Sequence, residues 1–184
     1  MDLVFLGIQG SGKGTQAKRI AQKYGYYVFD MGQELRTMAA SGTELGNTVK
    51  SFIDEGHLVP QDIIMQVVRA AVLAHGKGKM LFDGIPRDME QKAAFDALMK
   101  ETGRDFRCIN ILLSEEEALA RIRGRAGEQG RADDADEEKI LRRMQIFQEK
   151  TMPVVRAYIQ EEKLMQIDGS GTLDQVTAAI SQVL

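Results

Sequence analysis

The stretch GIQGSGKGT, residues 7–15, has the composition of a loop that binds phosphate. It follows an apolar run, and a glycine-rich turn between a strand and a helix points successive backbone N–H groups at one anion. Lys13 adds a mobile positive charge for the outer phosphates of a triphosphate. Gly14 stands where this loop class ordinarily has Ser or Thr, so the hydroxyl that ligates Mg²⁺ is missing. The metal must then be held by phosphates, waters and other groups.

The dinucleotide-binding pattern G-x-G-x-x-G is a competing interpretation of the same loop. Gly10 and Gly12 could begin it, and Asp30 lies about where its ribose-binding acid would be. The pattern fails at Thr15, where a third glycine is required. A lysine directly after Gly12 is what a triphosphate needs, so we predict nucleoside triphosphate binding.

Arginines elsewhere could hold further phosphate groups. Arg87 follows a strand end in DGIPR, where Gly84 and Pro86 define a turn, and Arg36 lies in a helical pattern. An isolated helical arginine is ordinarily a solvated surface charge, so Arg36 alone carries less weight than Arg87.

The stretch RIRGRAGEQGRADD, residues 121–134, places four arginines around a glycine-rich segment, and Arg143 follows it. The acidic residues nearby would fit a solvated basic surface. Phosphoryl transfer, however, needs charge neutralisation and exclusion of water, which mobile arginines closing over the phosphates can supply. Beside a triphosphate loop, we therefore predict an arginine clamp.

Short apolar runs alternate with helical patterns and must position these groups. The runs that predict strands are 3–7, 79–83, 108–113 and 164–168, with 26–29 as a weaker fifth. Strands that alternate with helices form a largely parallel sheet whose ligands lie beyond its carboxyl ends, where Asp83 and Asp168 fall. The fold class predicted is α/β, with a central parallel five-stranded sheet between helical layers.

Two stretches depart from a simple alternation of strand and helix. They are residues 31–73, which have the pattern of one helix after another, and the glycine-rich 124–132, and both are candidate mobile flaps. A long helical pattern runs from about 134 to 162, and Pro153 should kink or break it. With 184 residues and no linker composition, we expect a single domain.

Composition excludes several classes of protein. A formal net charge of −3 and few aromatic residues disfavour nucleic-acid binding, which the arginine-rich stretch would otherwise suggest. One cysteine, Cys108, allows neither an internal disulfide nor a cysteine zinc site, so we expect a cytoplasmic protein without zinc. No window is long and apolar enough to predict a membrane span.

The loop pattern G-x-x-G-x-G-K-G-T resembles that of the adenylate kinases and their nucleoside monophosphate kinase relatives. Further motifs of the family are LRTMAASGTELG (35–46), DEGHLVP (54–60), DGIPR (83–87), GRADD (130–134) and RRMQIFQEKT (142–151), so the resemblance covers nearly the whole chain. It implies a P-loop kinase of nucleotide biosynthesis that transfers phosphoryl from MgATP to AMP as a monomer, with no nucleic-acid or membrane partner. It also implies a core of 1–30, 60–125 and 133–184, an NMP-binding insertion of about 31–59, and a short lid of about 126–132.

The resemblance also implies the site residues. For ATP they are Gly10, Ser11, Gly12, Lys13, Gly14, Thr15, Arg121, Arg125 and Gly171. For AMP they are Arg36, Leu58, Val59, Gly84, Pro86, Arg87, Gln91, Arg131 and Arg143, with Gln91 reading adenine. The catalytic set is Lys13, Arg87, Arg125, Arg131 and Arg143, and Asp83 would hold Mg²⁺ through water. The count along the helix leaves Arg142 as an alternative to Arg143.

Two departures from the family pattern keep other functions open. Met31 replaces a threonine near the expected base site, which favours a kinase for another nucleoside monophosphate. Gln33 replaces an acid that helps organise metal-bound water, which favours a nucleotide-binding regulator with weak transfer activity. The cations converging on the phosphates favour an enzyme over a regulator.

Overall fold

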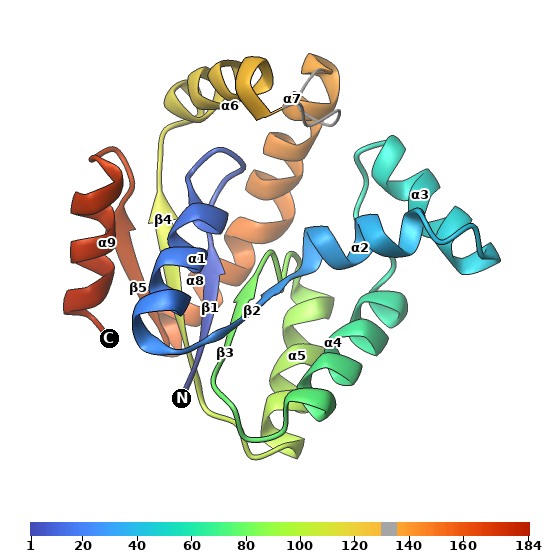
Figure 1. Ribbon diagram of the computed structural model, residues 1–184, viewed down its shortest axis with the longest axis horizontal. Helices are drawn as coiled ribbons and strands as arrows, with labels where there is room; N and C mark the ends of the chain where they lie inside the picture. The colour runs from blue at the N-terminus through green and yellow to red at the C-terminus, as the bar shows by residue number, and fades with distance from the viewer. Residues whose placement is uncertain (130–135) are drawn as a thin grey trace.

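The computed structural model describes residues 1–129 and 136–184, except for the side chains of 125–129. Its centre is a parallel five-stranded sheet in the order β2-β3-β1-β4-β5 (Figure 1). The strands are β1 (Asp2–Leu6), β2 (Tyr27–Asp30), β3 (Met80–Asp83), β4 (Phe106–Leu112) and β5 (Leu164–Asp168). The predicted fold class, including the weaker second strand, is confirmed.

The sheet forms because its central strands are apolar on both faces. Every residue of β1 and β3 is buried, as expected for parallel strands that are covered by helices on either side. Alternate residues of β1 face opposite layers: Val4 and Leu6 join one hydrophobic cluster, whereas Leu3 and Phe5 join another. The core therefore consists of two apolar layers, one on each face of the sheet.

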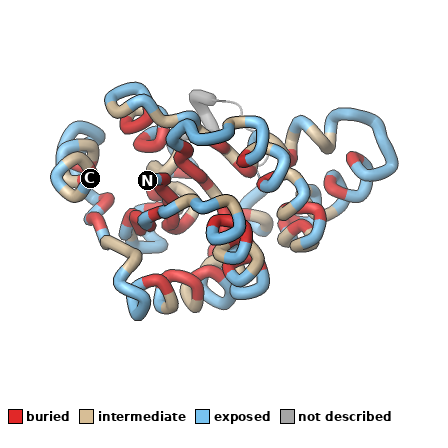
Figure 2. Tube along the Cα trace, turned by 90° about the horizontal axis from the view of Figure 1, so that it is seen from below, coloured by how far each residue is buried: buried red, intermediate tan, exposed pale blue. Residues whose placement is uncertain are grey.

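Helices supply the outer layers. On one face lie α4 (Gln61–His75), α5 (Met89–Glu101) and α8 (Met152–Gln160), and on the other lie α1 (Lys13–Tyr24) and α9 (Leu173–Gln182). Figure 2 shows buried positions along the strands and the inner sides of these helices. A third, smaller cluster joins α6 (Glu115–Gln129) to α7 (Glu137–Ile146) above the carboxyl edge of the sheet.

Helices α2 (Met31–Ala39) and α3 (Glu44–Asp54) extend away from the sheet (Figure 1). They pack chiefly against each other, and most of α3 is exposed. Asp30 begins α2 because its carboxylate accepts a hydrogen bond from Gln33 N at 3.0 Å, and Thr43 begins α3 through Gly46 N at 3.0 Å. This helical pair is attached to the core by β2 and by the segment before α4.

The long helical stretch differs from its prediction at Pro153. The chain remains helical, passing from α7 through a π-helical turn, η2 (Phe147–Thr151), into α8. Met152 N–H donates to the carbonyl of Phe147, five residues back. This wider turn accommodates the proline ring, which would otherwise clash with the preceding turn and lacks an N–H to donate. The helix therefore does not break at Pro153 as predicted, and its turn is instead widened locally, at η2.

The predicted flap at 124–132 also differs in part. Helix α6 continues through Gln129, so 124–129 are helical, and the rest of the flap lies outside the described residues.

A buried ion pair joins the starts of two strands to a loop at the opposite edge of the sheet. Arg104 donates from Nε to Asp2 Oδ2 at 2.6 Å and from Nη2 to Asp2 Oδ1 at 2.9 Å. Their side chains are only 9% and 4% exposed, and Asp2 Oδ1 also accepts from Met80 N at 2.9 Å. The pair thus fixes the start of β1 against β3 and the segment before β4.

We expect Asp2→Asn to lower the free energy of unfolding by about 3 kcal/mol, because it leaves the Arg104 charge buried without its counter-ion. Urea denaturation measures the change. Glu101→Gln is the control, since it breaks the exposed pair between Arg69 and Glu101 and should leave the midpoint unchanged. Equal effects of the two substitutions would contradict the role given to the buried pair.

Candidate active site

A cleft of about 1130 Å³ opens at the carboxyl edge of the sheet. Most of the site residues predicted from the sequence line it: Gly10, Gly12, Lys13, Gly14, Thr15, Arg36, Leu58, Val59, Asp83, Gly84, Pro86, Arg87, Gln91, Arg121, Arg143 and Gly171. Ser11 lies in the same loop with a buried side chain. The side chain of Arg125 and all of Arg131 lie outside the described part of the chain.

The glycine-rich loop leads directly into α1, which begins at Lys13. Gly10 has a φ of 87°, and a Cβ there would lie 2.7 Å from the carbonyl oxygen of Ala118 in α6. Only glycine fits so close to another backbone in this conformation. Lys13 Nζ donates to the carbonyls of Gly7 at 2.5 Å and Ile8 at 2.9 Å, which holds the ammonium group against the loop.

Two carboxylates stand side by side where strands end at this edge. Asp30 ends β2 and Asp83 ends β3, and the two are paired in the sheet register. A Cβ at Gly14 would lie 3.3 Å from Asp83 Oδ2, so the carboxylate adjoins the position from which the usual Ser or Thr hydroxyl would project. Oxygen donors beside a phosphate loop fit Mg²⁺, which binds through one or two carboxylates, waters and substrate phosphates. Asp30 also lines the cleft. The sequence did not predict it there, because Asp30 fitted only the rejected dinucleotide-binding pattern, as its ribose-binding acid.

Arg87 lies at the centre of the cationic part of the cleft. Its Nε donates to the Gly84 carbonyl at 2.8 Å, which fixes the guanidinium above the turn after β3. The residue is exposed to the cleft, but the surrounding protein removes enough water to lower the pKa of Arg87. The neighbouring charges of Arg143 and Arg36 lower this pKa further, whereas the carboxylates of Asp83 and Asp30 oppose the shift.

Gln33 orients Arg36 from the previous turn of α2. Arg36 Nη2 donates to Gln33 Oε1 at 3.1 Å. A Cβ at Gly32 would lie 3.1 Å from Arg36 Nη1, so glycine makes room for the guanidinium. The departure at residue 33 therefore gives Arg36 a neutral partner in place of a carboxylate.

The side of the cleft next to α2 and α4 is apolar. Met31 is fully buried there, and Leu35, Ile53, Leu58, Val59 and Ile64 also line the cleft. Gln91 is buried beside them, and its Oε1 accepts from the backbone N–H of Arg87 at 2.9 Å. This bond uses one of the two lone pairs of the amide oxygen and fixes the orientation of the amide, whose NH₂ is a donor that a base could use.

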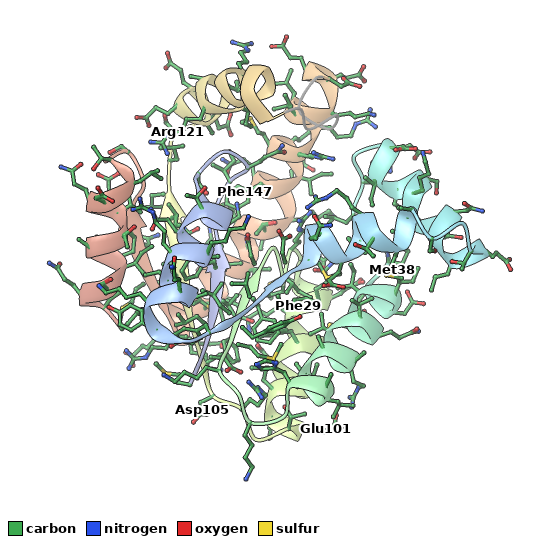
Figure 3. The ribbon with its side chains drawn as sticks, in the orientation of Figure 1. Phe29, Met38, Glu101, Asp105, Arg121 and Phe147 are labelled. Carbon is green, nitrogen blue, oxygen red and sulfur yellow. The ribbon has the colours of Figure 1, made fainter. Side chains whose placement is uncertain are left out.

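The opposite side of the cleft is formed by α6 and the segment between β5 and α9. Arg121 points from α6 toward this segment (Figure 3), and its Nη2 donates to Gly169 O at 2.9 Å. Gly171, in the same segment, also lines the cleft. Lys18 and Leu173 line it too, although the sequence did not predict them as site residues. The guanidinium of Arg121 can thus lie over a planar part of a ligand that is bound against the segment between β5 and α9.

The two candidate arginines of α7 face different neighbours. Arg143 lines the cleft and acts electrostatically on Arg87, as the prediction for Arg143 requires. Arg142 donates to the backbone carbonyl of Glu55, at the end of α3. Geometry therefore favours Arg143 over the alternative.

Among the side chains that the structure describes, no group of three or more His, Cys, Asp or Glu is placed to hold a metal ion. Cys108 is buried in β4, and burial raises the pKa of its thiol. Among the described helices, none is long and apolar enough to cross a membrane.

We expect Gly10→Ala to weaken ATP binding about tenfold or more, because it adds backbone strain and a clash with the Ala118 carbonyl. Titration calorimetry measures the affinity. Gly25→Ala is the control: Gly25 has a φ of 72° at the end of α1, with open space around its Cβ position. Unchanged ATP affinity in the Gly10 variant would contradict this account of the loop.

Comparison with known proteins agrees with the geometry. A family profile described as adenylate kinase matches residues 5–163. The adenylate kinase of Thermus thermophilus is 40% identical over 183 residues, covering 99% of this chain and 96% of the relative. The adenylate kinase of Bacteroides thetaiotaomicron is 35% identical over 186 residues, which cover 100% of this chain and 98% of the relative. The adenylate kinase of Stenotrophomonas maltophilia is 39% identical over 182 residues, which cover 98% of this chain and 97% of the relative. The resemblance predicted from the motifs is confirmed, and the chain belongs to the adenylate kinase family.

Proposed function

We propose that this protein transfers the terminal phosphoryl group of MgATP to AMP, giving two ADP in a reversible reaction. The observation that carries the proposal is the convergence of cations from separate elements on one cleft. Lys13 comes from α1, Arg87 follows β3 and Arg143 comes from α7. Such a cluster of like charges is unfavourable by itself and suits the phosphate groups of two nucleotides bound side by side.

The donor nucleotide would occupy the side of the cleft at α1. Backbone N–H groups of residues 10–15 would hold its β- and γ-phosphates, with Lys13 turning from the loop carbonyls toward them. Arg121 and Gly171 would enclose the adenine. Arg125 is proposed to add a further charge from α6 on the basis of the family pattern alone.

The acceptor would lie on the side of the insertion. Arg36 and Arg87 would hold the phosphate of AMP, with Arg131 and Arg143 bridging the two nucleotides. The base would enter the apolar region at Leu58 and Val59, where the NH₂ of Gln91 can donate to a purine ring nitrogen. Gly84 and Pro86 shape the turn that presents Arg87.

The reaction can proceed by direct in-line transfer. An oxygen of the AMP phosphate forms a bond to the γ-phosphorus of ATP as the bond between that phosphorus and the β,γ-bridging oxygen breaks. Negative charge spreads over the moving group, and the guanidinium and ammonium groups stabilise it. ATP leaves as ADP without its γ-phosphoryl group, and AMP leaves as ADP with that group attached. Because the group passes directly from one nucleotide to the other, no covalent enzyme intermediate or strong protein base is needed.

Asp83 fits the role of holding Mg²⁺ through bound water, because its carboxylate adjoins the phosphate loop at Gly14. The ion, when bound with ATP, neutralises the β- and γ-phosphates. The carboxylate of Asp30 is near enough to Arg87 to offset part of the positive charge of Arg87. It lies beside Asp83 in the sheet, so it could also accept hydrogen bonds from water bound to the Mg²⁺ ion.

Closure of the cleft would exclude water from the transfer. We propose that the insertion of about 31–59 and the short lid of about 126–132 move over the core, with the exposed pair α2 and α3 supplying one side. We also propose a monomer acting in the cytoplasm, where a free thiol such as that of Cys108 stays reduced.

A kinase for another nucleoside monophosphate is the second candidate, since Met31 is buried at the apolar side of the cleft. Phosphorus NMR with ATP, Mg²⁺ and separately AMP, GMP, CMP or UMP distinguishes the two. Rapid formation of ADP with AMP alone is the result expected. Turnover with only a different monophosphate, or none with any, would refute transfer to AMP.

We expect Arg87→Ala to lower kcat/KM for AMP by at least about 100-fold while the Kd for ATP changes less than about threefold, because Arg87 faces the acceptor. Initial rates and ATP titrations measure the two quantities. Arg69→Ala removes an exposed arginine of α4 that pairs with Glu101 of α5. It should leave kcat/KM for AMP and the Kd for ATP unchanged. A loss of ATP affinity larger than the loss in kcat/KM would place Arg87 on the donor side instead.

A further inference from the structure

A hydrogen bond links the insertion to α7 across the cleft. Arg142 Nη1 donates to the carbonyl of Glu55 at 2.8 Å, and Glu55 is the residue at which α3 ends. Figure 1 shows the end of α3 turning back toward α7 before the chain descends into α4. Because α3 otherwise packs chiefly against α2, this contact ties the insertion to the element that carries Arg143.

The geometry at the end of α3 explains why Glu55 accepts this bond. Gly56 N–H donates to Ile53 O at 3.0 Å and His57 N–H to Phe52 O at 2.9 Å, with Gly56 in the left-handed conformation at a φ of 73°. This is the pair of bonds that closes a Schellman turn. The turn satisfies two of the carbonyls at the helix end and leaves that of Glu55 for Arg142.

Charge and packing both favour the contact. A cation at the carboxyl end of a helix is stabilised by the helix dipole. A Cβ at Gly56 would lie 3.7 Å from Arg142 Cδ and 3.9 Å from Lys139 O, so the turn and α7 are in close contact. Glu138, one turn earlier on α7, lies 3.3 Å from Arg142 Nη2 and orients the guanidinium. These contacts direct the guanidinium of Arg142 at the insertion.

We propose that Arg142 is a positioning residue for the acceptor, a proposal that rests on the function given above. The turn at Gly56 leads straight into Leu58 and Val59, which line the apolar side of the cleft. By holding this turn against α7, Arg142 sets the distance between the base region and Arg143, one residue further along α7. Arg142 is not among the residues that line the cleft, and it would act through the backbone of Glu55.

The test compares Arg142→Ala and Arg142→Lys with the wild type, with Arg69→Ala as a control that loses an exposed arginine elsewhere. We expect Arg142→Ala to raise the KM for AMP about fivefold, with kcat and the KM for ATP within about twofold of wild type. Arg142→Lys keeps one donor for the carbonyl and should recover at least half of the lost affinity. Three results would overturn the proposal: an unchanged KM for AMP in Arg142→Ala, an equal rise in the KM for AMP and the KM for ATP, or a KM for AMP in Arg142→Lys as high as in Arg142→Ala.

Hydrogen exchange supplies a readout that does not depend on catalysis. In the nucleotide-free protein, Arg142→Ala should speed amide exchange at residues 56–59 about threefold or more and leave that of α4 unchanged. If the wild type transferred no phosphoryl group, the proposed function would fail, yet this measurement would still decide whether Arg142 holds the turn. Unchanged exchange at 56–59 would overturn the proposal.

Discussion

Mutual repulsion among the cations of the cleft is the constraint on which the rest of the structure depends. Arg36 and Arg143 lie close enough to Arg87 that the charge of each lowers the pKa of Arg87. In partly dehydrated surroundings, such repulsion would drive flexible side chains apart. Three cations of the cleft are instead held by hydrogen bonds: Arg87 by the Gly84 carbonyl, Arg36 by Gln33, and Lys13 by the loop carbonyls. Phosphates entering this region would relieve the repulsion.

The fold supplies rigid supports for these groups. Parallel strands end at one edge, which sets the carboxylates of Asp30 and Asp83 next to each other and beneath the arginines. Their negative charges offset part of the repulsion, as their opposing effect on the pKa of Arg87 indicates. The α7 helix brings Arg143 to the same place and is continued through η2 into α8, which is anchored in the core. Helix α7 therefore connects the core to the cleft.

Local sequence pattern predicted the supports well. Continuous apolar runs identified the strands because strands buried on both faces carry no polar alternation, and Gly10 and Lys13 identified the loop because few other arrangements use those residues. Pattern failed where the outcome depended on partners far along the chain. It predicted Arg143 but left Arg142 as an alternative, since a count along the helix carries an error of one residue. Only the fold shows that Arg142 faces Glu55 and that Arg143 lines the cleft. Asp30 was missed for the same reason, because its place beside Asp83 comes from strand pairing.

The central claim is that one continuous cleft holds both nucleotides with their phosphates meeting between Lys13 and Arg87. Titration calorimetry with two adenosines joined 5′ to 5′ by five phosphates tests it most directly, because that molecule spans a donor triphosphate, an acceptor monophosphate and the group between them. The account predicts one molecule bound per chain, more tightly than ATP or AMP, with both nucleotides displaced. Binding of two molecules per chain, or displacement of only one nucleotide, would contradict it.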